Sequence, residues 1–254
     1  MPRGNQTMSP GNQPSHDRGR AFKVIGIVAG CLAIGLLLVL SLTTRRPPAS
    51  TPDAAEAVDV DGTRAKAERG DAEAQKQMGS IYAKGEVVKQ NYAEAARWYR
   101  SAADQGHAGA QTALGELYEA GQGVPCDEAE AAQWYRRAAE QGHVVGQYCL
   151  AVLYVMGKGV PRDIAEAVKW YRQAADQGNA LAQYNLGMRH NEGDGVPQDR
   201  VEAYKWLKLA AAQGLPDAAQ ARDELKRSMT REQIAEGQRR ADAFAARNPV
   251  PPPH

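Results

Sequence analysis

The stretch His143–Gly178 reads HVVGQYCLAVLYVMGKGVPRDIAEAVKWYRQAADQG, and its pattern occurs four times in succession. The equivalent units begin at Asp71, His107 and Asn179, and each is 36 residues long. Self-similarity with a period of about 20 to 50 residues is typical of solenoids, in which each unit packs only on its neighbours. The period therefore predicts a stack of like units over residues 71–214.

Each unit has the pattern of a helical hairpin. In its first half an apolar residue is followed directly by a small residue, as in Leu150 and Ala151. An aromatic residue, here Tyr154, lies four positions after the apolar one. Residues i and i+4 share one face of a helix, and the small residue lets another helix approach closely. A Gly-x-Gly-Val-Pro loop follows in units two to four, where glycine allows positive φ and proline ends a helix. Unit one has Val87 and Lys89 in this loop, so we expect a different turn there.

The second half of each unit predicts a capped helix that carries a tryptophan. Asp163 and Glu166 have the spacing of a capping box, in which the aspartate accepts from first-turn amides and the glutamate reaches back. These paired acids are therefore predicted to start helices, not to catalyse. We expect Trp170 to fill the space between its hairpin and a neighbour. The equivalent positions are Asn91, Asp127 and Asp199, with Trp98, Trp134 and Trp206.

The repeats divide the chain into segments. The four units are 71–106, 107–142, 143–178 and 179–214, and terminal helices must cover the exposed apolar ends of such a stack. Residues 61–70 resemble an isolated second half and predict an N-terminal capping helix. Residues 215–247 predict C-terminal capping helices, in which Thr230 and Gln233 form a capping box and Ile234 and Phe244 give the last helix an apolar face. Residues 248–254 form a proline-rich tail.

The amino-terminal part predicts a membrane anchor. Residues 1–23 are rich in Gly, Pro, Asn, Gln and Ser, which predicts a disordered tail. Residues 24–42 lack any charge, and a helix of this length crosses a hydrocarbon core of ~30 Å. A cleaved signal peptide is the alternative, which the long apolar run and the missing small-x-small site disfavour. Residues 43–60 predict a Pro/Ala linker.

Basic residues set the expected orientation of this anchor. Arg18, Arg20 and Lys23 precede the span, and the positive-inside bias then places the amino terminus in the cytoplasm and the repeats on the periplasmic side of the inner membrane. Arg45 and Arg46 follow the span, which keeps the opposite orientation open.

The combined pattern in units two and three is Ala-x-x-x-Leu-Gly-x-x-Tyr, Gly-x-Gly-Val, Asp-x-x-x-Ala and Trp-Tyr-x-x-Ala-Ala-x-Gln-Gly. It resembles the Sel1-like repeat family of tetratricopeptide-like hairpins. The resemblance implies an all-α, right-handed superhelical solenoid that scaffolds protein complexes, commonly in bacterial envelopes and signalling, and it implies no chemistry. Some secreted members join successive repeats by cysteines at two positions, which here hold Ala103 with Gln111, Ala139 with Gln147 and Ala175 with Gln183. The only cysteines of the repeats, Cys126 and Cys149, lie at different phases, so we expect no disulfide between them.

Composition and motifs exclude several function classes. The 31 Lys and Arg residues nearly balance the 30 Asp and Glu residues, which argues against nucleic-acid binding. No His-Glu-x-x-His, Gly-Lys-Ser/Thr, Gly-x-Ser-x-Gly or Ser-x-x-Lys motif occurs. His107 and His143 share a repeat phase and should lie about 10 Å apart, too far to share a metal. We therefore predict no enzyme activity, cofactor, metal or small-molecule substrate.

The first helices of units three and four differ from the others. In a tetratricopeptide-like stack, positions three, six, ten and thirteen of each unit face a concave groove, and units one and two have small or polar residues there. Units three and four are mainly apolar, which predicts a groove for an amphipathic helix or apolar peptide. Tyr148 and Tyr184 are the expected anchors and Met156 and Met188 the adaptable contacts. The predicted groove residues are Val145, Tyr148, Val152, Val155, Met156, Leu181, Tyr184 and Met188.

Alternatives stay open at this point. The last helix could cover the groove with Ile234 and Phe244, or two copies of the chain could associate through it. Arg189 and His190 replace the usual aliphatic residue and tyrosine, either because unit four is looser near the end of the stack or because they meet an acidic group of a partner. The preferred function is a membrane-tethered, non-catalytic adaptor that binds a protein or peptide. An envelope hydrolase of atypical type and a purely structural tether are the alternatives.

Overall fold

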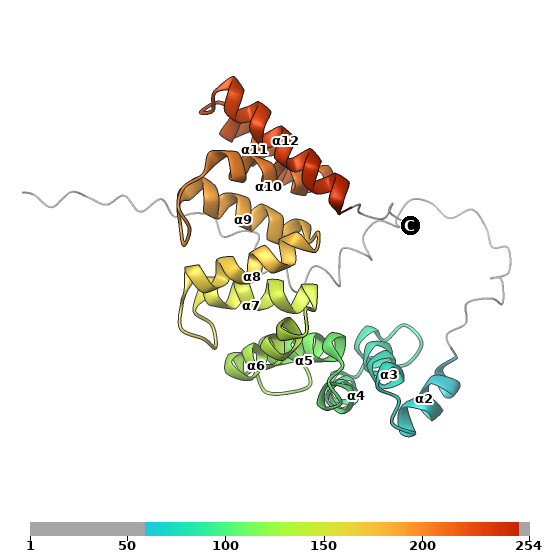
Figure 1. The fold of residues 1–254 in the computed structure, drawn as a ribbon. Helices are drawn as coiled ribbons and strands as arrows, with labels where there is room; N and C mark the ends of the chain where they lie inside the picture. Colours follow the sequence, from blue (N-terminus) through green and yellow to red (C-terminus); the bar gives the residue numbers. More distant parts are fainter. Residues whose placement is uncertain (1–58, 249–254) are drawn as a thin grey trace, which may run out of the picture. The chain divides into compact units, whose positions relative to one another are not determined.

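The computed structural model describes residues 59–248, which contain eleven α-helices and no strand. The helices follow one another through the stack in chain order (Figure 1). The predicted disordered tail, membrane helix 24–42, most of the linker and residues 249–254 lie outside the described residues. None of the eleven helices combines the length and apolar composition needed to span a bilayer. The helices are α2 (Val60–Glu68), α3 (Ala72–Lys84), α4 (Tyr92–Asp104), α5 (Ala108–Ala120), α6 (Glu128–Glu140), α7 (Val144–Met156), α8 (Ile164–Asp176), α9 (Ala180–Glu192), α10 (Arg200–Ala212), α11 (Pro216–Lys226) and α12 (Arg231–Arg247).

The four units are helical hairpins, as predicted. The first or A helices are α3, α5, α7 and α9, and each packs on the B helix that follows it, α4, α6, α8 or α10. Each B helix packs in turn on the next A helix. The A helices α5 and α7 also contact each other, and no two of the B helices α4, α6, α8 and α10 contact each other to the same extent. The A helices therefore lie on the inner side of the stack.

Side-chain caps begin every repeat helix. Asp71, His107, His143 and Asn179 each accept a hydrogen bond from a first-turn amide of an A helix. The Asx residues before the B helices accept from their first-turn amides, as predicted. The predicted return contact of the glutamates is wrong. Glu94 pairs with Arg97, Glu166 with Lys169, and Glu130 accepts from the Trp134 indole. The N-cap amides that the glutamates were predicted to bind donate instead to a carbonyl of the preceding A helix, as Asp163 N does to Tyr154 O at 3.0 Å.

The second loop glycine is required at the junction between units. Gly159 has φ +64°, and a Cβ there would overlap the Glu128 carbonyl at the start of the preceding B helix. Gly123 and Gly195 make the same close approach to the units before them. Val87 stands at this position in unit one and is 54% exposed. Glycine is thus needed where two units meet, for both its positive φ and its lack of a side chain.

Buried glutamines join successive units. Gln111 Nε2 donates to the Ala103 carbonyl of the preceding unit at 3.1 Å, and Gln111 Oε1 accepts from Gln141 Nε2 at 2.7 Å. The same two bonds recur at Gln75, Gln147 and Gln183. The resemblance to Sel1-like repeats assigns these positions to the cysteines that join repeats in some secreted members, and this chain has a hydrogen bond there. Cys126 and Cys149 form no disulfide with each other, as predicted.

The carboxyl-terminal helices close the stack. Thr230 and Gln233 form the predicted capping box at the start of α12. This helix packs on α10, where the Phe244 and Trp206 rings lie 5.2 Å apart at 69°. At Gly237 a side chain would overlap Tyr204, so the helix approaches α10 closely. At the other end α2 packs on α3.

Candidate protein-interaction surface

The predicted groove residues fall into two sets. Tyr148 and Val152 are 1% and 2% exposed, and the Tyr148 ring lies 6.0 Å from the ring of Tyr171 on α8. The structure therefore places these two residues inside the domain, where a partner cannot contact them as predicted. The other six keep part of their surface exposed: Val145, Val155, Met156, Leu181, Tyr184 and Met188.

The carboxyl-terminal helices cover the unit-four end of this set. Tyr184 and Met188 pack against a core cluster that includes Leu225 of α11, and Ile234 of α12 packs on the same cluster. Phe244 instead contacts Trp206, so α12 lies on α10 and not across α7. The alternative of intramolecular covering therefore applies to unit four only.

The same inner positions in unit two carry two carboxylates. Glu116 is only partly exposed, and burial raises its pKa to about 7, with the neighbouring Glu119 charge adding to the shift. Glu119 accepts a hydrogen bond from the Tyr135 hydroxyl at 3.0 Å. Burial also raises the pKa of Tyr99 to about 12, although a hydrogen bond with Ser80 opposes the shift. The inner surface thus changes from acidic in unit two to apolar in unit three.

A second set of contacts pairs arginines with aromatic residues across unit junctions. Arg136 of α6 donates to the Tyr154 hydroxyl of α7 at 2.7 Å, and Arg100 and Tyr118 pair in the same way one unit earlier. In unit four His190 replaces the tyrosine and lies 3.0 Å from Arg172. Arg189, which precedes His190 in the sequence, forms ion pairs within its own unit, with the carboxylates of Glu192 and Asp194.

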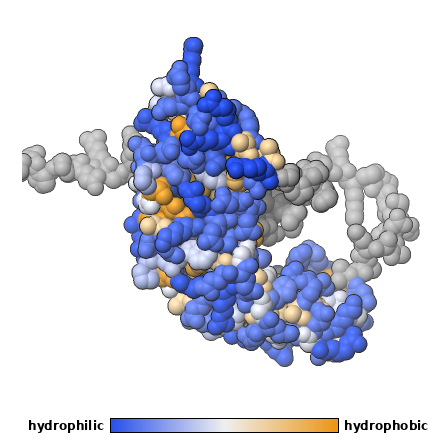
Figure 2. Space-filling view, in the orientation of Figure 1, coloured by the Kyte–Doolittle hydropathy of each residue, from blue (hydrophilic) through white to orange (hydrophobic). Residues whose placement is uncertain are grey.

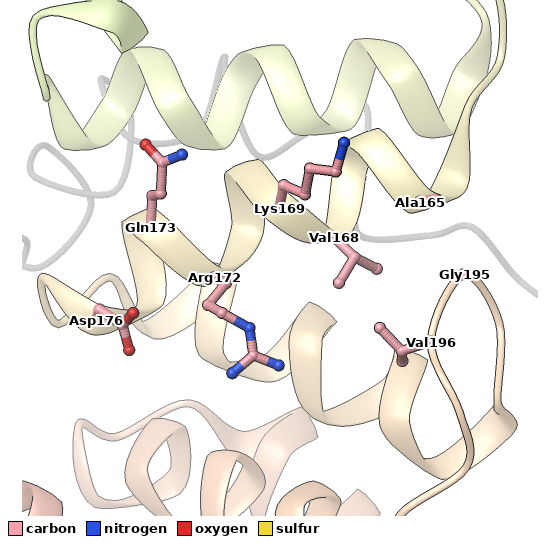
Figure 3. Close-up of a pocket in the computed structure, with 8 residues that line it drawn as sticks. All are labelled: Ala165, Val168, Lys169, Arg172, Gln173, Asp176, Gly195 and Val196. Carbon is pink, nitrogen blue, oxygen red and sulfur yellow. The ribbon is translucent and has the colours of Figure 1, made fainter.

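A shallow cavity of about 550 Å³ lies between α8 and the segment before α10. Figure 3 shows Val168, Arg172 and Val196 pointing into it. The visible face of the repeats is mostly hydrophilic, with a small apolar area at the level of α8 and α9 (Figure 2). The cavity holds no pairing of nucleophile and base. Its lining residues are Ala165, Val168, Lys169, Arg172, Gln173, Asp176, Gly195 and Val196.

The repeat histidines have structural partners. His107 and His143 accept backbone hydrogen bonds as N-caps, and their other contacts are Glu73 at 2.8 Å and Thr112 at 3.0 Å respectively. Burial, followed by the charges of His107 and Lys76, lowers the pKa of His143. Within residues 59–248 no three potential metal ligands are grouped.

Comparisons with known proteins agree with this architecture. The Sel1 repeat family model matches residues 72–107, 108–143, 144–179 and 180–215, each one residue later than the units defined above. No curated protein matches the chain.

Two solved structures are similar at 37% identity. A protective antigen present in uropathogenic Escherichia coli strains, with an SLR fold, aligns over 74% of this chain and 41% of its own, with a TM-score of 0.67. A Sel1 repeat protein from Oxalobacter formigenes aligns over 65% of this chain and 48% of its own, with a TM-score of 0.62. The matched region thus spans less than half the length of either protein. Sel1 repeats form a scaffold fold for protein–protein interaction that is generally non-catalytic, and the chain belongs to the Sel1 repeat family.

Proposed function

We propose that this protein is a membrane-tethered, non-catalytic adaptor that binds a segment of a partner protein on the inner face of its A helices. The supporting observation is a contrast between repeat positions. The junction glutamines, loop glycines and helix caps repeat from unit to unit, whereas the inner A-helix positions change from acidic to apolar. Positions that the scaffold does not need to keep constant are the ones on which specificity can depend.

The contact surface we propose is smaller than the predicted groove. It consists of the partly exposed apolar residues that the carboxyl-terminal helices leave uncovered, flanked by Glu116 and Glu119. An amphipathic helix with a basic end would match this order of apolar and acidic surface. The apolar part is Val145, Val155, Met156 and Leu181.

The anchor and its orientation complete the proposal. Residues 24–42 form the membrane helix, and the repeats lie on the periplasmic side of the inner membrane. A tether of this kind holds the binding surface near the bilayer and raises the local concentration of partners found there.

Site-specific photocrosslinking in cells tests the proposed surface. A photoreactive residue at Met156 or Leu181 of the full chain should give the same discrete adduct with a second protein. The matched control is Lys169, which is exposed on the B helix α8. An adduct of equal yield from Lys169, or none from either A-helix position, would refute binding on the inner face.

A further inference from the structure

One unit junction differs from the others in its chemistry. At the earlier junctions a B-helix arginine meets a tyrosine hydroxyl, which stays neutral at physiological pH. At the junction between units three and four, Arg172 of α8 lies 3.0 Å from Nε2 of His190 on α9. Histidine is the side chain whose ordinary pKa of about 6.5 lets it change charge near neutrality. This junction alone among the arginine–aromatic pairs described therefore combines arginine with a titratable ring.

The Arg172 contact fixes the protonation state of His190. A guanidinium has only donors, so Nε2 of His190 must be the unprotonated acceptor and the ring proton must be on Nδ1. Nδ1 is buried and has no hydrogen-bond partner. His190 is only 7% exposed, so water does not compensate for this contact if it is lost. The folded state thus accommodates the neutral ring.

The charges that face His190 come from two helices and their caps. Burial is the main cause that lowers the pKa of His190, and the Arg172 charge is the next. Glu202 and Asp199, from α10 and its N-cap, act in the opposite direction, and Lys205 of α10 lowers the pKa further. The Glu202 carboxylate pairs with Arg240 of α12 at 2.9 Å and with Lys205 at 3.3 Å, and so is partly neutralised.

We propose that the Arg172–His190 pair is a pH-sensitive contact, in which protonation of His190 places a second cation against Arg172 and weakens the junction between units three and four. The stability of a solenoid is close to a sum of unit and junction contributions, so a weaker junction lowers the stability of the stack at that point. Because α12 packs on α10, the helices beyond the junction would move together as α9–α12.

The direction of the pH effect follows from the lowered pKa. As the pH falls, His190 gains its proton at about pH 6.5 in the unfolded chain and at a lower pH in the folded chain. The Arg172–His190 pair therefore contributes its full stability above about pH 6.5 and loses it as the pH falls through the lower folded pKa. Leu181 of the proposed binding surface lies on α9, so acid would also alter that surface.

Hydrogen exchange of the full-length chain at pH 7.5 and 5.5, corrected for intrinsic exchange rates, tests this proposal without a partner. We expect amide protection in α9 and α10 to fall at pH 5.5 by up to about tenfold, because pH 5.5 lies about one unit below the ordinary histidine pKa. His190→Tyr restores the pair of the other junctions and should abolish this fall. His143→Asn is the matched control, because Asn179 serves as the same N-cap one unit later, and it should leave the fall in α9 and α10 unchanged.

Two further measurements keep the test decisive if tyrosine does not fit. His190→Asn cannot be protonated and should also remove the pH response, whereas Tyr154→His should create one at the junction of units two and three. An imidazole of His190 that titrates at or above about pH 6.5 by NMR would overturn the proposal, as would an unchanged pH response in both His190 variants. A failure of the photocrosslinking experiment would leave this result unaffected.

Discussion

Replacing Glu116 with glutamine should stabilise the domain at high pH and have little effect at low pH. The folded state raises the Glu116 pKa from 4.5 to about 7, because burial penalises the charge and Glu119 repels it. Glutamine has nearly the same shape but no charge, so it removes this penalty.

The size of the change in stability follows from the pKa shift of Glu116. A folded pKa above the unfolded one means that the folded state binds the extra proton, so this stabilisation is complete below about pH 4.5 and is lost as the pH rises through about 7. At 1.36 kcal/mol per pKa unit, the ionised carboxylate costs an upper limit of about 3 kcal/mol at pH 8. At pH 5 the corresponding cost is below about 1 kcal/mol.

Urea unfolding at pH 5 and pH 8 measures this difference. Glu116→Gln should raise the free energy of unfolding at pH 8 by up to about 3 kcal/mol more than Glu140→Gln, an exposed control on the B helix of the same unit. A gain of the same size at both pH values would refute the reasoning, since a pH-independent gain cannot come from removing a titrating charge.

Four other changes have expected outcomes. Gly159→Ala should destabilise the domain by at least about 2 kcal/mol in urea unfolding, whereas Gly142→Ala, which has positive φ but no atom within 4 Å of the new Cβ, should cost only about 1 kcal/mol. Gln147→Leu removes the bonds of Gln147 with the Ala139 carbonyl and with the side chains of Gln173 and Gln177, and should lower the free energy of unfolding by about 2 kcal/mol; no loss would show that the junction bonds are dispensable. Phe244→Ala should cost about 3 kcal/mol and make α12 the first site of limited proteolysis. Deletion of residues 24–42 should move the chain from the membrane to the soluble fraction, and retention in the membrane would refute the anchor.

The sequence period was enough to predict the hairpins, because each fixed position has a local cause. Asp163 caps its helix and Gly159 permits its turn through interactions that a sequence pattern can express. Contacts between units were harder to predict. Helical phase gave the direction in which Tyr148 and Val152 point but not the proximity of the surrounding helices, which bury both.

Partners within a unit were also ambiguous from sequence. Glu166 has capping-box spacing, yet its carboxylate pairs with Lys169, because the Asp163 amide that it was predicted to bind already donates to the Tyr154 carbonyl. The regular recurrence of Gln75, Gln111, Gln147 and Gln183 was a readable signal for the junction bonds, since glutamine is seldom buried without a partner. The membrane helix and its orientation remain predictions.

The junction glutamines also bear on how the length of this protein can change. At each junction the glutamine side chain of one unit donates to the equivalent backbone carbonyl of the unit before it. Any two internal units can therefore form the same bond with each other. Duplication or loss of one 36-residue segment within the stack would leave every junction bond with a partner of the same kind. The carboxyl-terminal cap has no such freedom, because Gly237 of α12 fits against Tyr204, and the other B helices have alanine or valine at that position. A gene encoding this protein could therefore lengthen or shorten in the middle, while its terminal unit stays matched to its cap.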